Sequence, residues 1–121
     1  MGQKKAFRPH IRKIAAGDAT DILRYPERDP VPSNQRHHIT LLSFEDETSN
    51  CTEVQISAGR LDVQRRIAEQ IAPAAGRTYF FNDEIVLTDG ERLQVYFSGA
   101  TALDVLDLWL QGYWVEVIED A

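Results

Sequence analysis

Histidine, the side chain best suited to acid–base catalysis and metal binding near neutral pH, occurs three times in this sequence. His10 lies in a basic N-terminal segment, whereas His37 and His38 are adjacent in an apolar run typical of a strand. Because successive strand residues point to opposite faces, His37 and His38 are not expected to chelate one metal ion. A hydrolase would need His37, an acidic residue and a serine in one cleft. The histidines alone predict no metal site.

The other potentially reactive side chains also lack the spacing that chemistry requires. No nucleophile-elbow sequence surrounds Ser43, Ser57 or Ser98. The single cysteine, Cys51, excludes an intrachain disulfide, has no predictable base partner and is expected to pack in the interior. Acidic pairs could bind calcium, but they lack EF-hand spacing. These pairs include Asp83 with Glu84, Asp89 with Glu91, and Asp104 with Asp107. We therefore predict a protein that is not an enzyme, with no catalytic residue, metal or cofactor.

Aromatic residues are more numerous than one small core needs. Runs such as 79–81 and 113–114 must place aromatic rings on both faces of a strand. Packing within the chain is the default, but an outward aromatic face is also typical of a subunit interface or a carbohydrate-binding platform. The interface candidates among them are Tyr79, Phe81, Trp109, Tyr113 and Trp114.

The charge of the chain is strongly asymmetric. Residues 1–13 contain five basic residues and no acid, whereas residues 14–121 contain 8 basic and 19 acidic residues. The five basic residues are Lys4, Lys5, Arg8, Arg12 and Lys13. We predict that residues 1–19 form an extended basic arm, which is either a solvated tail, a clasp on a neighbouring subunit or a contact for phosphate. Without interleaved aromatic residues, nucleic-acid binding is not expected.

Length and hydropathy indicate one domain that does not span a membrane. The chain has 121 residues, within the usual range for a single domain. No apolar run approaches the roughly 20 residues that a membrane-spanning helix needs, and no secretory signal follows the basic start. The lone cysteine fits folding in a reducing cytoplasm.

The pattern of apolar runs and turn residues predicts an all-β fold. Proline-rich residues 26–34 form a surface connection, and the acidic turn 45–50 is expected to join two strands into a hairpin. The expected strands are residues 20–25, 37–44, 51–57, 64–71, 77–81, 85–87, 92–97 and a long final strand. Residues 20–121 are thus predicted to form one antiparallel β-sandwich, jelly-roll or immunoglobulin-like, of about seven to eight strands.

Two segments also fit a helix. Residues 61–71 contain apolar residues four apart, but strands on both sides favour a strand. The second segment begins near Thr101. Thr101 with Asp104 resembles a helix N-cap and favours a helix, whereas the alternation of Leu106, Leu108 and Leu110 with other residues favours a strand. We predict a strand for both.

The order of short motifs from residue 37 to 117 resembles small all-β virion proteins of tailed bacteriophages. The segments that carry the resemblance are Ala72–Gly76, Asn82–Leu87, Asp89–Val95, Ser98–Val105 and Gln111–Tyr113. The resemblance implies a non-enzymatic structural subunit of the tail, the neck or collar, or the head-decoration layer. It further implies a symmetric homo-oligomer, other virion structural proteins as partners, and a place in the virion after synthesis in the host cytoplasm.

A binding module is the alternative function. An exposed aromatic side chain on a β-sandwich can bind a carbohydrate or another host-surface ligand. The candidates for this role are Trp109, Tyr113 and Trp114.

Overall fold

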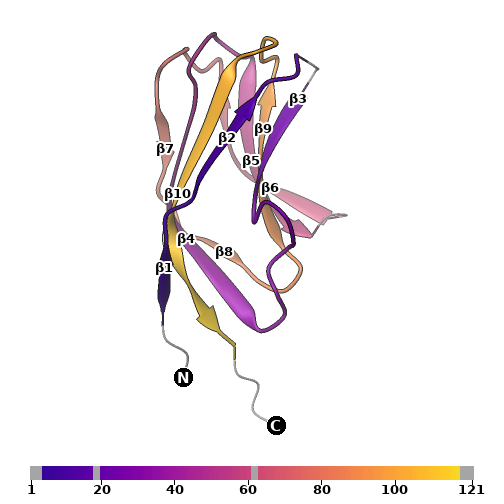
Figure 1. The fold of residues 1–121 in the computed structure, drawn as a ribbon, viewed down its shortest axis with the longest axis vertical. Helices are drawn as coiled ribbons and strands as arrows, with labels where there is room; N and C mark the ends of the chain where they lie inside the picture. The colour runs from indigo at the N-terminus through magenta and orange to yellow at the C-terminus, as the bar shows by residue number, and fades with distance from the viewer. Residues whose placement is uncertain (1–3, 18–19, 61–62, 118–121) are drawn as a thin grey trace.

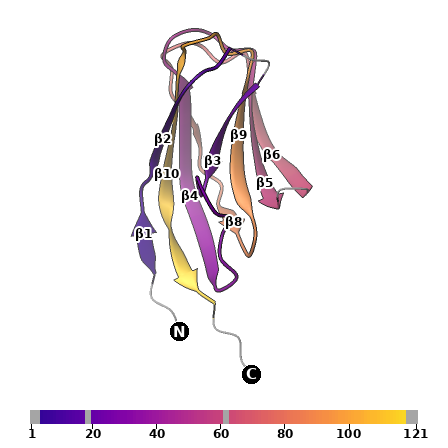
Figure 2. The same cartoon turned by 45° about the vertical axis from the view of Figure 1, so that its right-hand side comes forward.

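The computed structural model describes residues 4–17, 20–60 and 63–117, which form ten β-strands and no helix. The strands make two antiparallel sheets packed against each other, as Figures 1 and 2 show. The predicted all-β sandwich is therefore confirmed. No helix that could cross a membrane occurs in the described ranges.

The first sheet has six strands built around the two longest ones. Its main order is β1, β10, β4, β7, while β2 continues along the β1 side of β10 and β8 along the β7 side of β4. The bounds are β1 Lys5–Phe7, β2 His10–Ile14, β4 Gln35–Asp46, β7 Tyr79–Phe81, β8 Ile85–Leu87 and β10 Val105–Glu116.

The second sheet has four strands in the order β3, β9, β5, β6. The bounds are β3 Thr20–Tyr25, β5 Glu53–Arg60, β6 Val63–Ile71 and β9 Arg92–Ser98. In the described part of the chain, β6 pairs only with β5, so its other edge is open at the end of this sheet (Figure 2).

The core lies between the sheets and is built from alternate residues of facing strands. On β10 the buried apolar residues are Leu106, Leu108 and Leu110, and on β9 they are Leu93, Val95 and Phe97. The alternation on β10 was predicted, and Val54 and Ile56 on β5 are buried in the same way. The predicted strand over 64–71 is confirmed as β6, whereas residues 61–62 lie outside the described residues. The predicted final strand is also confirmed, although it begins at Val105 after a turn at Thr101–Asp104.

The predicted N-terminal arm is not separate from the sandwich. β1 pairs with the C-terminal part of β10 and β2 pairs with its N-terminal part. These two strands raise the number of strands from the predicted seven or eight to ten. Beyond β2, the Ala15 amide donates to the Asp104 carbonyl at 2.8 Å. The described part of this segment is extended, as predicted, but it is bound along its own chain rather than available as a clasp.

One prediction of strand pairing is wrong. β4 and β5 do not form a hairpin, because the turn after Asp46 carries the chain from the first sheet to the second. The long last strand β10 is paired along both edges, by β4 on one side and by β1 and β2 on the other. Alternation identifies the buried face of a strand but not the strand beside it.

Candidate functional site

The outer face of the first sheet carries a row of four side chains that crosses β2, β10, β4 and β7. The register places Trp109 opposite His10 on one side and Ser43 on the other, and Ser43 opposite Phe80. Directly opposed residues project to the same face of a sheet. Leu108, Leu110 and Phe44 are buried in the core, so their neighbours Trp109 and Ser43 point outward.

A hollow of about 200 Å³ lies against Trp109 on this face. Its lining comes from the β1–β2 connection and from adjacent positions of β4 and β10: Arg8, Pro9, Leu41, Ser43, Trp109, Leu110 and Gln111. We use the name Trp109 surface for His10, Ser43, Phe80 and Trp109 together with Arg8, Leu41 and Gln111.

A buried carboxylate fixes one side of the Trp109 surface. Asp107 is fully buried and accepts hydrogen bonds from His10 Nε2 at 2.7 Å and Arg12 Nε at 2.8 Å. Burial alone would raise the pKa of Asp107, but the hydrogen bonds from Arg12, His10 and Glu47 outweigh it and lower that pKa. The ionised carboxylate therefore holds the His10 ring, which stacks on Trp109 at a centroid distance of 4.9 Å and an angle of 12°.

Tyr113 and Trp114, by contrast, are covered from both neighbouring strands. Tyr113 has Lys4 Nζ 4.5 Å from its ring centroid on the β1 side and the stacked ring of His38 at 4.6 Å on the β4 side. Trp114 lies between Lys5 and the ring of His37 in the same way. These two predicted candidates are therefore occupied within the chain.

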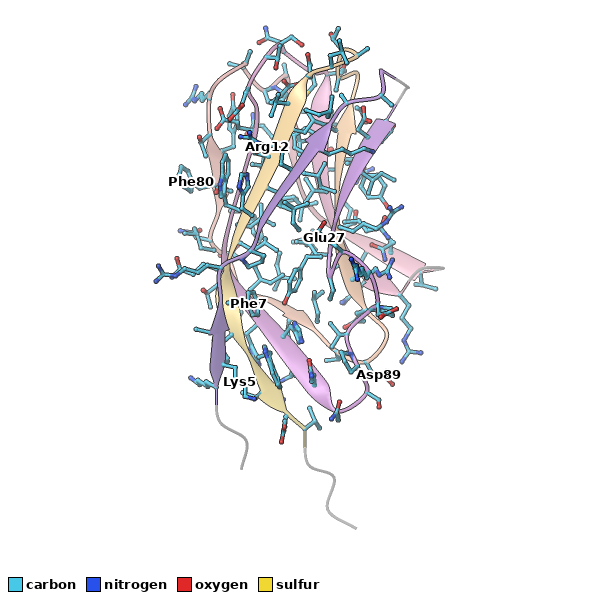
Figure 3. The ribbon with its side chains drawn as sticks, in the orientation of Figure 1. Lys5, Phe7, Arg12, Glu27, Phe80 and Asp89 are labelled. Carbon is cyan, nitrogen blue, oxygen red and sulfur yellow. The ribbon has the colours of Figure 1, made fainter. Side chains whose placement is uncertain are left out.

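The aromatic run of β7 faces differently from the prediction. Tyr79 and Phe81 are half-buried and pack against the core, and Tyr79 stacks on Phe44. Phe80 is 68% exposed and lies at the outer margin of β7 in Figure 3. An apolar run of three aromatic residues does not reveal which of its faces is buried, so sequence reasoning missed Phe80.

Four of the five basic N-terminal residues have partners within the chain. Lys4 and Lys5 cover the two aromatic rings, and Arg12, labelled in Figure 3, binds Asp107. Lys13 Nζ lies 3.4 Å from the buried Asp21 carboxylate. Arg8 is exposed and lines the hollow beside Trp109. The basic side chains of this segment thus contact acidic groups and aromatic rings of the sandwich itself.

A cluster of aromatic rings holds β1 at the lower end of the sandwich. Phe7 stacks on Tyr25 at 5.1 Å and lies 5.8 Å from the ring of His37. The Tyr25 hydroxyl donates to His37 Nδ1 at 2.7 Å, and His37 Nε2 donates to Gln35. Burial, followed by the charge of His38, lowers the pKa of His37, and burial raises the pKa of Tyr25 to about 12. Both rings are therefore neutral and structural near pH 7.

The three histidines do not form a catalytic group. His37 contacts Tyr25 and Gln35, whereas His38 points to the opposite face and binds Glu84, as the alternation predicted. In the described residues, no histidine ring hydrogen-bonds a serine. The carboxylates of Glu45, Glu47 and Asp107 lie within 4.8 Å of one another, but Arg12 and His10 already bind Asp107.

A second acidic pair, Asp46 and Asp104, lies at the upper end of the sandwich. Asp104 accepts hydrogen bonds from Ser49 Oγ at 2.5 Å and from the Thr101 amide at 3.1 Å. Asp46 Oδ1 accepts from two backbone amides of the next turn, but its buried Oδ2 accepts no hydrogen bond from any described residue. Burial and the adjacent Asp104 carboxylate raise the pKa of Asp46 to about 6.

Asp46→Asn should stabilise the protein near neutral pH. The ordinary pKa of this carboxyl is 3.8 and its folded value is about 6, so the folded state keeps a proton between these values that the unfolded chain has lost. Stability therefore rises as the pH falls through that window and is lost above it. Asparagine keeps the Oδ1 acceptor and gives Asp104 a permanent donor, which should add about 1 kcal/mol to the free energy of unfolding at neutral pH.

Urea unfolding of both proteins at about pH 7.5 and about pH 4.5 measures this difference. The gain of Asp46→Asn should shrink toward zero at the lower pH, where Asp46 itself is protonated. Asp46→Ala, which removes the acceptor as well, should be destabilising at both values. An asparagine variant less stable than the parent at neutral pH would contradict the raised pKa of Asp46.

A third feature is a group of exposed apolar side chains on the edge strand β6 of the second sheet and on β8. The exposed apolar side chains there are Val63, Ile67 and Ile71 on β6 and Val86 on β8, and we call these four residues the β6 side. Val63 and Ile71 are 64% and 60% exposed. A hollow of about 310 Å³ lies between β6 and β8, and its charged lining residues are Arg65, Arg66 and Glu84.

Comparison with known proteins assigns the chain to no family. No protein-family model and no curated protein sequence matches the chain significantly. An alpha-L-fucosidase structure from Bacteroides thetaiotaomicron matches 84% of this chain at 6% identity and a TM-score of 0.46, but the chain spans only 21% of that protein.

Two further structures match over most of both chains. The Tobacco streak virus coat protein is 12% identical, with 94% of this chain and 88% of that one covered and a TM-score of 0.43. The carbohydrate-binding module CBM29-2 is 10% identical, with 93% and 92% covered and a TM-score of 0.39. At these levels the likeness concerns the fold alone, and the chain is an all-β, two-sheet sandwich.

Proposed function

We propose that this chain is a non-enzymatic structural subunit of a tailed-bacteriophage particle and assembles as a homo-oligomer through its β6 side. The single observation that carries self-association is the open edge of β6 beside exposed apolar side chains. The ordered motifs between residues 37 and 117 carry the virion assignment, as a resemblance in sequence.

The β6 side has the features of an interface rather than of an ordinary solvated edge. β6 is nine residues long, and an exposed long edge strand with apolar side chains favours association. A bulge opposite Ile56 and Ser57 twists this edge, so association would bury side chains more than it would extend the hydrogen-bonded ladder.

Charge on the same surface is self-complementary. Arg65 and Arg66 on β6 and Glu84 before β8 line one hollow. A second copy can therefore oppose basic and acidic groups around these apolar side chains, which favours a defined arrangement over random clustering. The partner that we propose for the β6 side is another copy of the chain.

Light scattering during gel filtration tests the self-association. The parent protein should give a multiple of the 13.7 kDa subunit mass, and the double variant Ile67→Lys, Ile71→Lys should give the subunit mass. Ile14→Lys is the matched control, because Ile14 is 52% exposed but lies on β2 of the other sheet. A monomeric parent, or a double variant that still assembles, would refute the β6 interface.

The virion assignment needs a separate test. Immunogold labelling of tailed-phage particles that carry this gene should place the chain on the head, neck or tail. Particles without the label would contradict the virion assignment and leave the self-association result untouched.

A further inference from the structure

Trp109 differs from the two other large rings of β10 in what lies on its β4 side. At positions 113 and 114 the residue across on β4 is a histidine that stacks on the ring, whereas at position 109 it is Ser43. Serine is too small to cover an indole. In the described residues only His10, from the opposite side, stacks on Trp109.

We infer that the Trp109 surface binds a neutral oligosaccharide, with one sugar ring packed on the indole of Trp109. This inference is independent of the proposed self-association, because the Trp109 surface and the β6 side have no residue in common and are built on different strands, β2, β10, β4 and β7 for the first and β6 and β8 for the second.

The indole is held in place before any ligand arrives. His10 stacks on one side of it and is itself fixed by the hydrogen bond to the fully buried Asp107, which Arg12 also binds. A ring whose rotamer is fixed by such contacts loses little conformational entropy on binding. An aromatic residue that served only as core filling would not require this support on an outer face.

Polar groups around the hollow suit hydroxyl-rich ligands. The Gln111 side-chain amide supplies a donor and an acceptor and the Arg8 guanidinium supplies donors, and both line the same space of about 200 Å³. Ser43 also lines this space but is buried. Among the described residues, neither the Gln111 amide nor the Arg8 guanidinium has a hydrogen-bond partner. A sugar ring presents C–H groups on its face and hydroxyls at its rim, which matches a stacking wall with polar neighbours.

The charge of the surrounding face favours a neutral ligand over an anionic one. The next row along the sheet carries Glu45, Asp107 and Glu47, and Arg12 is already bound to Asp107. Among the described residues that line the hollow, Arg8 alone has a basic side chain. A phosphate backbone or a sulfated glycan would therefore meet as much negative as positive charge here.

Phe80 provides a second exposed aromatic ring on the Trp109 surface, so that the surface can contact more than one sugar ring. It lies two strands from Trp109 along the same row, across Ser43, and neighbouring strands are about 5 Å apart, so the two aromatic residues are separated by about 10 Å at the backbone. That distance exceeds one sugar ring, so the expected ligand is an oligosaccharide rather than a monosaccharide.

Tryptophan fluorescence titration with cellohexaose, maltohexaose and mannohexaose tests this site, with a heparin hexasaccharide as the anionic probe. At least one neutral hexasaccharide should give a saturable change in the parent protein, and Trp109→Ala, followed by calorimetry, should weaken binding about tenfold or more. Gln111→Ala and Phe80→Ala remove exposed side chains without disturbing the core and should each weaken binding about threefold to tenfold.

Trp114→Phe is the matched control, because Lys5 and His37 cover that ring. It should bind as the parent does and should retain the fluorescence change, which then reports Trp109 alone. Far-ultraviolet circular dichroism checks that each variant is folded. The inference is overturned if no neutral hexasaccharide binds at millimolar concentration, if only heparin binds, or if Gln111→Ala, Phe80→Ala and Trp109→Ala all bind as tightly as the parent.

Discussion

Gly112→Ala should destabilise the sandwich by about 3 kcal/mol or more, although it adds a single methyl group. Gly112 lies at the bulge where β10 shifts register against β4. A Cβ atom there would lie 1.9 Å from the His38 carbonyl oxygen and 3.0 Å from the ring of Phe7. The oxygen belongs to the backbone, so relief requires the two longest strands to separate and the Phe7 ring to leave its cluster.

Urea unfolding followed by circular dichroism measures the loss. Gly76→Ala is the control, because Gly76 has a φ of +71° but the nearest atom to an added Cβ is 3.9 Å away. That substitution should cost only the strain of a left-handed backbone, about 1 kcal/mol. If Gly112→Ala is no more destabilising than Gly76→Ala, the close approach of β4 and β10 described here is incorrect.

Phe97→Ala should lower the free energy of unfolding by about 3–5 kcal/mol, since it empties the centre of the core. Phe97 lies on the central strand β9 and is fully buried, and its ring meets Phe44 edge-on at 6.2 Å and 84°. The surrounding strands are fixed by their own hydrogen bonds, so the cavity should collapse only partly.

Phe80→Ala makes the same substitution at a site that is 68% exposed. It should change the free energy of unfolding by less than about 0.5 kcal/mol. Comparable losses in the two variants under the same urea titration would mean that Phe80 packs in the interior, and would also remove it from the Trp109 surface.

Alternation predicted the strands well because it reports burial directly. Leu106, Leu108 and Leu110 differ from their neighbours in polarity, and one buried sheet face is enough to fix which of them point inward. Alternation did not decide β6, whose apolar residues four apart also fitted a helix. The strand was favoured there because strands were expected on both sides of it.

Strand pairing was less predictable because it depends on contacts between distant residues. Nothing in residues 1–19 indicates that Phe7 pairs with Gly112 and that its ring lies against that glycine. The basic residues suggested a free arm, yet their partners are an acid and two rings near the other end of the chain. The charge pattern therefore identified the N-terminal segment as distinctive, but it did not predict that its basic residues bind groups of the same chain.

The candidate site was predicted in part. Trp109 was predicted as a possible ligand contact along with Tyr113 and Trp114. What distinguishes the three is the residue opposite each ring on β4, which is a serine for Trp109 and a histidine for the other two. Asp107 was expected on the polar side of β10 and is fully buried instead, because Arg12 and His10 cover it from β2. Cross-strand neighbours of this kind are invisible in a single sequence.

The reactivity of one introduced thiol tests assembly through the β6 side most directly. The native Cys51 is buried, and burial raises its pKa to about 11, so it should remain almost unreactive toward maleimide. Ile71→Cys places a single accessible thiol on the β6 side, and Ile14→Cys places one on the other sheet as a control.

Maleimide labelling of both variants should be measured from nanomolar to high micromolar protein concentration. The account predicts that labelling at position 71 slows at least about tenfold as the protein assembles, while labelling at position 14 stays constant. Equal rates at position 71 across the whole concentration range would contradict it.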